Sequence, residues 1–256
     1  MNMNDKAELL DLALRVGKKA AALLSARPDV LEISTKSSDV DIVTQMDKAA
    51  EELIVSSILA ERPGDGMIGE EGADRTSTSG ITWVIDPLDG TVNYFYGLPG
   101  WNVSIAAKDK DGVVVGVVVS PTINSTWWAT RGGGSFHNGK KIQCNDPVEL
   151  NRTMLATGFA YESQKRALQL DFINKLLPYF RDIRRNGAAA VDLAFVGAGN
   201  VDAYFESGLH EWDLAAGGLI ATEAGAILTQ HEVGGQNFTL AAGPHLHQIL
   251  KNTLGL

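Results

Sequence analysis

The chain has 256 residues, of which 45% are hydrophobic and 21% charged, so it can bury a full core and does not resemble a disordered segment. Its formal net charge of −9 opposes binding to nucleic acid or to an anionic membrane. The single cysteine, Cys144, excludes an intramolecular disulfide and has no partner at zinc-ligand spacing. The charged N-terminus lacks a signal-peptide core, and the longest apolar stretch, residues 113–119, is too short to span a bilayer. We therefore expect a soluble cytoplasmic protein.

Two helices are predicted at the start of the chain. An apolar stripe covers residues 5–26 and ends before Pro28, and a second stripe covers residues 44–60. Thr44 followed three residues later by Asp47 is typical of a capping box at the start of the second helix.

The middle of the chain predicts a sheet, because β-branched and aromatic residues dominate it. An apolar run over residues 81–85 leads into Asp86, and Asn138-Gly139 is a strong hairpin signal. The other strands expected here are residues 103–107, 113–119 and 126–130.

Beyond residue 150 strands and helices alternate, which is typical of an α/β arrangement. The expected strands are 154–158, 182–185, 201–206 and 226–230, and the expected helices are 163–177, 188–198 and 212–224. We therefore expect an N-terminal α+β lobe (residues 1–148) and a C-terminal α/β lobe (residues 149–256) packed as one unit, because no linker-like segment separates them. Binding sites are common at such a seam.

The segment 83–91 carries the strongest chemical signal. An apolar strand is expected to end at Asp86, Pro87 to bend the chain, and Asp89 to follow, so that two carboxylates and the carbonyl of Leu88 emerge together. Oxygen ligands without a nearby thiol or imidazole select a hard cation such as Mg²⁺ or Mn²⁺. The simpler interpretation of either dipeptide alone is a turn at a strand end.

Further acids have simple explanations when they are taken one at a time. Glu70 and Glu71 lie between glycines as in a solvated loop, whereas Asp213 and Asp47 stand where helices begin and could be caps. Beside the acids of segment 83–91, Glu70 and Glu71 become plausible metal ligands, and Glu70 a base for activating water. All these acids gathered in one pocket would be tolerable only with divalent cations among them.

These motifs, in this order, resemble the inositol monophosphatase family of the fructose-1,6-bisphosphatase-like superfamily. The resemblance extends from Thr35 to Gly225 and rests on residues 41–47, 69–71, 83–91, 187–190 and 212–217. It implies a layered αβαβα sandwich of mixed α+β and α/β character. It also implies a Mg²⁺-dependent, lithium-sensitive phosphatase that is commonly a homodimer.

The resemblance further implies a metal site of two or three ions. Glu70, Asp86 and the carbonyl of Leu88 would hold a first Mg²⁺. Asp86, Asp89 and Asp213 would hold a second, and Glu70 would help to hold a third. Mn²⁺ is the alternative ion.

Roles in catalysis and substrate binding are implied in the same way. Gly90 and Thr91 would bind phosphate through their amides, and Thr91 paired with Asp47 would polarise the attacking water. The substrate would also contact Asp89, Asp213, Glu206, which accepts hydrogen bonds from its hydroxyl groups, and Ala189, which lines the pocket. Lys36 matches a loop position near the metals.

The expected substrate is a small phosphorylated polyol or amino alcohol, with inositol monophosphate as the leading candidate. The alternative is histidinol phosphate, whose enzymes often carry an acid after the glycine that matches Gly187, where this chain has Ala188. Bisphosphates are less favoured, because Arg184-Arg185 is the only candidate basic pair in the sequence. A different class of function, a non-catalytic partner of the transcription machinery, would leave the acids unexplained.

Overall fold

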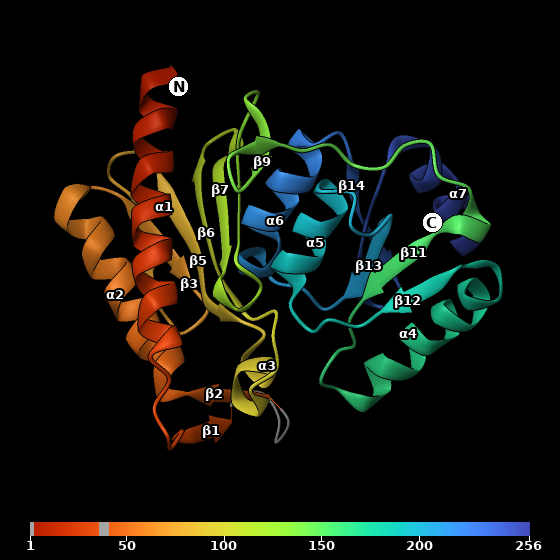
Figure 1. Cartoon of the computed structure of the whole chain (residues 1–256), viewed down its shortest axis with the longest axis horizontal. Coiled ribbons are helices and arrows are strands. Elements are labelled where there is room, and N and C mark those ends of the chain that lie inside the picture. The colour runs from red at the N-terminus through yellow and green to blue at the C-terminus, as the bar shows by residue number, and fades with distance from the viewer. Residues whose placement is uncertain (1–2, 36–40) are drawn as a thin grey trace.

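The computed structural model describes residues 3–35 and 41–256, and its elements stack in five layers, αβαβα (Figure 1). The two sheets form the second and fourth layers. The three helical layers are α1 (Met3–Ser25) with α2 (Gln45–Glu61), α5 (Ala189–Gly197) with α6 (Glu211–Glu223), and α4 (Ser163–Leu176) with α7 (Pro244–Leu254). The predicted sandwich is therefore confirmed.

The larger sheet has eight strands in the order β10-β9-β8-β7-β6-β5-β3-β4. Strands β3 and β5 run parallel, and the other neighbours run antiparallel. Their bounds are β3 Gly66–Gly69, β4 Asp74–Arg75, β5 Thr82–Asp89, β6 Asn102–Asp109, β7 Gly112–Ser120, β8 Ser125–Thr130, β9 Gly134–His137 and β10 Lys140–Lys141. The predicted hairpin turn at Asn138-Gly139 is confirmed, since both residues have positive φ and join β9 to β10.

Strand β5 does not end at Asp86, as the sequence suggested, but continues to Asp89. Its pairing with β6 shifts register between these two residues. Pro87 lies within the shift, where a residue without an N–H is tolerated because the regular ladder is interrupted. Gly90 follows with a φ of 85°, a left-handed conformation that favours glycine, and helix α3 (Thr91–Tyr96) begins.

The smaller sheet is mixed, with the order β12-β11-β13-β15-β14. Strand β11 runs parallel to both of its neighbours, and the other pairs are antiparallel. The bounds are β11 Met154–Thr157, β12 Asp182–Arg184, β13 Ala203–Ser207, β14 Ile227–Val233 and β15 Gln236–Ala242. Outside both sheets lie the hairpin of β1 (Ile33–Thr35) with β2 (Ile42–Thr44) and three short 3₁₀ helices, Pro121–Ile123, Leu150–Arg152 and Leu177–Tyr179.

Helices α5 and α6 form a central layer between the sheets. Small side chains of the two helices, among them Ala190 and Ala216, pack on the larger sheet, whereas Leu193 and Val196 of α5 pack on Tyr204 of the smaller one. Because this layer contacts both sheets, the division into lobes near residue 148 remains a prediction. No helix within the described residues combines the length and apolarity needed to cross a membrane.

Candidate active site

Four acids from distant parts of the chain meet at the end of β5. Asp86 is buried, and its pKa is raised well above the ordinary value by burial and by the negative charges of Glu70, Asp89 and Asp213. A hydrogen bond between the Asp86 and Glu70 side chains adds to this rise, and such a bond between two carboxyl groups requires a proton on one of them. The fold thus gathers acids that the sequence keeps far apart.

Asp89 is held by three hydrogen-bond donors. The side-chain amide of Asn102 donates to Oδ2 at 2.8 Å, and the backbone amides of Ala189 and Ala190 donate at 3.1 and 2.9 Å. Burial raises the pKa of Asp89 to about 7, although the hydrogen bond from Asn102 opposes the rise. Ala189 thus reaches the site through its backbone at the start of α5.

The sequence interpretation missed Asn102. It is fully buried and lies opposite Asp89 in the pairing of β5 with β6. A polar residue at the start of a strand whose centre is apolar was the available signal. Its meaning depended on the register shift after Asp86, which the sequence did not predict.

Thr91 and Asp47 form a hydrogen-bonded pair. The hydroxyl of Thr91 lies 3.0 Å from Oδ1 of Asp47 and 3.0 Å from the carbonyl oxygen of Leu88. The other oxygen of Asp47 accepts the backbone N–H of Thr44 at 2.8 Å, which confirms the predicted capping box of α2. Asp47 therefore caps a helix and contacts Thr91 at the same time.

Glu51 fixes the loop that carries Glu70. Its carboxylate accepts the backbone N–H groups of Glu71 and Ala73 at 3.0 and 2.9 Å. The amide of Glu70 itself donates to the carbonyl of Ile85 on β5 at 3.2 Å. Glu51 was not singled out from the sequence, because an acid on a helix of a −9 protein carries no special signal.

Asp213 also has two contacts of different kinds. Its carboxylate accepts the backbone N–H of His210 at 2.6 Å, so the cap interpretation is correct for the start of α6. Its charge nevertheless contributes to the raised pKa values of Asp86 and Asp89. The side chain therefore lies within electrostatic reach of the acids on β5.

Glu206 reaches the same site from the smaller sheet. The hydroxyl of Tyr204 donates to its Oε2 at 2.6 Å, and a Cβ at Gly158 would overlap its carboxylate. Burial raises the pKa of Glu206 to about 7, opposed by the hydrogen bond from Tyr204, and the charge of Asp213 contributes to the rise. The site thus draws acids from both sheets.

The acids fit a hard divalent cation in their chemistry. They offer carboxylate oxygens whose negative charges repel one another, and a divalent cation among them would relieve that repulsion. In the part of the chain that the structure describes, no group of three or more His, Cys, Asp or Glu side chains forms a metal-binding arrangement as it stands. Lys36 lies outside the described residues.

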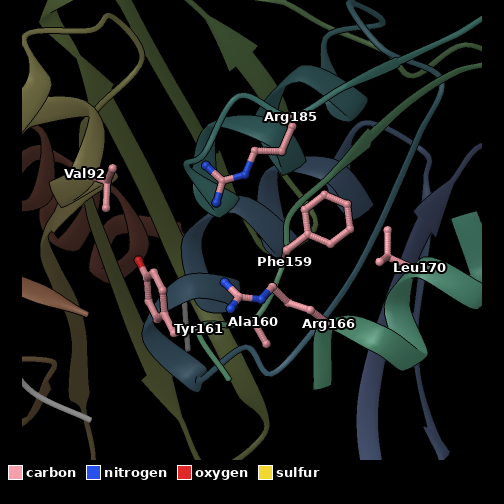
Figure 2. Close-up of a pocket in the computed structure, with 7 residues that line it drawn as sticks. All are labelled: Val92, Phe159, Ala160, Tyr161, Arg166, Leu170 and Arg185. Carbon is pink, nitrogen blue, oxygen red and sulfur yellow. The ribbon is translucent and has the colours of Figure 1, made fainter. Parts of the chain in front are cut away.

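A cavity of about 430 Å³ borders the site (Figure 2). It is lined by Val92, Phe159, Ala160, Tyr161, Arg166, Leu170 and Arg185. The two arginines of the pair Arg184-Arg185 have different surroundings. Arg184 pairs with Asp182 at 2.5 Å, whereas Arg185 shares the cavity with Arg166, a residue of another element that sequence spacing could not connect to it.

Comparisons with known proteins point in one direction. A profile described as the inositol monophosphatase family matches residues 5–252. The chain is 41% identical over 237 residues to the Nus factor SuhB of Escherichia coli K12, covering 91% of this chain and 88% of that protein. It is 38% identical over 261 residues to the inositol-1-monophosphatase SuhB of Mycobacterium tuberculosis, covering 93% and 90%.

The solved structures agree with this. The Thermotoga maritima IMPase superposes with a TM-score of 0.87 at 31% identity, covering 97% of each chain. The chain therefore belongs to the inositol monophosphatase family.

Proposed function

We propose that this protein is a Mg²⁺-dependent phosphomonoesterase that hydrolyses inositol monophosphate to inositol and inorganic phosphate. The observation that carries the proposal is the gathering of Glu70, Asp86, Asp89 and Asp213 around the end of β5. Family membership supports a phosphatase, and the inositol-1-monophosphatase of M. tuberculosis supports this substrate.

The same four acids, with the carbonyl of Leu88, would hold two or three Mg²⁺ ions, or Mn²⁺ in their place. When bound, such ions supply positive charge to the phosphate oxygens and make water a better nucleophile. The resemblance assigns phosphate binding to the amides of Gly90 and Thr91. Each of these roles is a proposal that substitutions can test.

Thr91 and Asp47 would orient the attacking water. Because the Thr91 hydroxyl donates its proton to Asp47 or to Leu88, its lone pairs can accept a hydrogen bond from water. This would polarise the water toward the phosphorus atom, with Glu70 as an additional acceptor nearby. Little covalent work is then required of side chains.

Glu206 would recognise the leaving alcohol. Since Tyr204 donates to Oε2, Oε1 remains to accept a hydrogen bond from a polyol hydroxyl group. Histidinol phosphate is the alternative substrate, and Ala188 in place of an acid argues against it. The homodimeric state expected from the resemblance also remains a proposal.

A second candidate function comes from the name of the E. coli relative, a Nus factor. It corresponds to the non-catalytic role in transcription that we weighed from the sequence. A purely binding protein would release no phosphate from any ester, and substitution of Asp89 would then leave its function unchanged.

The test is release of inorganic phosphate by the purified protein. Inositol 1-phosphate, histidinol phosphate, fructose 1,6-bisphosphate and adenosine 3′,5′-bisphosphate would be compared with Mg²⁺ and with chelator, and with Li⁺ present or omitted. We expect Mg²⁺-dependent release from inositol 1-phosphate that Li⁺ inhibits. Absence of release from every ester would overturn the proposal and favour the binding role.

A further inference from the structure

The register shift in β5 turns two acids toward the same face of the larger sheet. Asp86 lies opposite Ser104 of β6. Asp89, three residues further along β5, lies opposite Asn102, which is only two residues from Ser104. Residues three apart on a regular strand point to opposite faces, whereas residues two apart share a face. The extra residue in β5 therefore places both acids on one face, each beside a polar residue of β6.

These two polar residues of β6 have different contacts, although both are buried. The side-chain amide of Asn102 donates to Oδ2 of Asp89 at 2.8 Å and lies 3.5 Å from the backbone carbonyl oxygen of the same residue. The hydroxyl of Ser104 donates instead to the carbonyl oxygen of Trp212 at 3.4 Å. Asn102 is thus the residue of the pair whose side chain engages an acid.

The other end of the Asn102 amide is left unpaired. Its Oδ1 is buried and accepts no hydrogen bond from residues 3–35 or 41–256. An unpaired buried polar atom costs stability, and an apolar side chain of similar size would avoid that cost. Turning the amide around would set Oδ1 against the carboxylate of Asp89, so it would bring no relief. The contact of Nδ2 with Asp89 is therefore what accounts for asparagine at this position.

The donors around Asp89 are divided unequally between its two oxygens. Oδ2 accepts two hydrogen bonds, from Nδ2 of Asn102 and from the amide of Ala190. Oδ1 accepts one, from the amide of Ala189. Because each carboxylate oxygen can accept about two hydrogen bonds, the scaffold engages Oδ2 fully and leaves one position open on Oδ1.

We propose that Asn102 is a positioning residue for cation binding, which engages Oδ2 of Asp89 so that Oδ1 is the oxygen offered to Mg²⁺ or Mn²⁺. The inference rests on the proposed function and adds to it a residue that does not itself contact the cation. Without Asn102, the carboxylate would be held by two backbone amides alone, and both oxygens would have an open position. The cation would then have to order Asp89 as it binds, which lowers its affinity.

The first experiment titrates the purified protein with Mn²⁺ in the absence of substrate and measures the free ion by electron paramagnetic resonance. Asn102→Leu keeps a similar volume and removes the amide, and Asn102→Ala removes it together with most of the side chain. We expect the Kd for Mn²⁺ to rise about tenfold in both variants, as is usual when a residue that orients a metal ligand is lost.

Melting curves in chelator show that each variant is folded at the temperature of the titration. A residue needed only for packing would change the melting temperature and leave the Kd of the folded protein unchanged. That result would overturn the proposal.

Ser104→Ala is the matched control. Ser104 is the neighbouring buried residue on the same face of β6, and its hydroxyl contacts a backbone carbonyl group instead of an acid. We expect this variant to bind Mn²⁺ with the wild-type Kd. An equal loss of affinity in Ser104→Ala and in the Asn102 variants would show that any change in β6 disturbs the site, and would reject a specific role for Asn102.

A second measurement uses the wild-type protein alone and does not depend on the folding of a variant. Anomalous scattering from a crystal grown with Mn²⁺ locates the ion. We expect it beside Oδ1 of Asp89, with Oδ2 still bound to Nδ2 of Asn102. An ion on Oδ2, or a carboxylate turned away from Asn102, would contradict the inference.

Failure of the proposed function is detected separately, because the titration requires no turnover. If the wild-type protein binds Mn²⁺ but releases phosphate from no ester, the phosphatase proposal fails and the comparison of Kd values still decides the role of Asn102. If the wild-type protein binds no Mn²⁺, that role is rejected as well.

Discussion

The acids on one side of the site and the arginines on the other are held in opposite ways. Asp89 is buried and accepts three hydrogen bonds from the scaffold, whereas the side chains of Arg166 and Arg185 are exposed and form none within the described residues. Fixed groups suit a reaction whose geometry does not vary, since misplacement of a catalytic group is costly. Adaptable groups suit recognition of the part of a substrate that differs from one ester to the next.

The largest effect is expected from a substitution among the buried acids. Asp86→Asn removes a charge from the crowded acids, and we expect kcat/KM on inositol 1-phosphate to fall at least about 100-fold. The metal-free variant should nevertheless be more stable than wild type, with a melting temperature higher by about 2–4 °C, because mutual repulsion is relieved. Calorimetry with chelator measures this directly.

The stability difference between Asp86→Asn and wild type should depend on pH. Because the pKa of Asp86 is raised above its ordinary value of 3.8 in the folded state, its cost to stability is absent below that value and grows as pH rises. The stability gap between Asp86→Asn and wild type should therefore widen from about pH 4 toward neutrality. A gap that narrowed over this range would show that the acids are not crowded.

Asp89→Asn provides a comparison with Asp86→Asn among the buried acids. It also removes a charge, but an amide at this position would set its NH₂ group against the N–H donors of Asn102, Ala189 or Ala190. We expect a similar loss of activity with a lower, not higher, melting temperature. Equal stabilisation by both substitutions would mean that these hydrogen bonds contribute little.

The next largest effect is expected from substitution of Thr91. Thr91→Val keeps the shape of the side chain and removes the hydroxyl that contacts Asp47, so kcat should fall by about 10- to 100-fold with little change in KM. Thr91→Ser keeps the hydroxyl and should retain most of the activity. If valine and serine variants were equally active, the hydroxyl would have no part in positioning water.

Tyr204→Phe tests the hydrogen bond that Tyr204 donates to Glu206. It removes one hydrogen bond to Glu206, and KM for inositol 1-phosphate should rise about three- to tenfold, with a smaller effect on 4-nitrophenyl phosphate. Since that hydrogen bond lowers the pKa of Glu206 from a higher value to about 7, the pH at which KM improves should move upward in the variant. An unmoved pH profile would reduce Tyr204 to a packing residue.

The smallest effect is expected from added salt, which weakens exposed charges more than buried ones. Raising KCl from 50 to 500 mM shortens the screening length from roughly 14 Å to about 4 Å and weakens exposed charge pairs more than buried ones. The KM for inositol 1-phosphate should rise about two- to fourfold, because exposed arginines near the site attract the anionic substrate less, while kcat changes less. Equal losses in kcat and in KM would show that the buried acids and the exposed arginines are equally open to solvent.

Sequence patterns predicted the elements more fully than the contacts between them. Helices predicted at 5–26 and 44–60 correspond to Met3–Ser25 and Gln45–Glu61, because apolar periodicity reports a face that must be buried. Strand β15 and helix α7 were not predicted, and the length of β5 was wrong. Its extension to Asp89 depends on a register shift with β6 that local propensity does not encode.

The candidate site divides in the same way. The resemblance to a known family implied that Asp86, Asp89 and Asp213 belong together, whereas the residues alone left Asp213 as a possible helix cap. Glu51 and Tyr204 were missed because their importance comes only from what they contact in three dimensions. The grouping of Arg166 with Arg185 has the same origin.

The amides of Ala189 and Ala190 that hold Asp89 begin the helix whose far side packs on the other sheet. The two halves of the chain therefore cannot be treated as interchangeable parts. A chimera that joined the first 148 residues to the second half of a relative would have to rebuild this helix start against β5 before Asp89 regained its position. Changes of sequence are therefore constrained where the start of α5 meets β5. They are freer around the exposed side chains of Arg166 and Arg185.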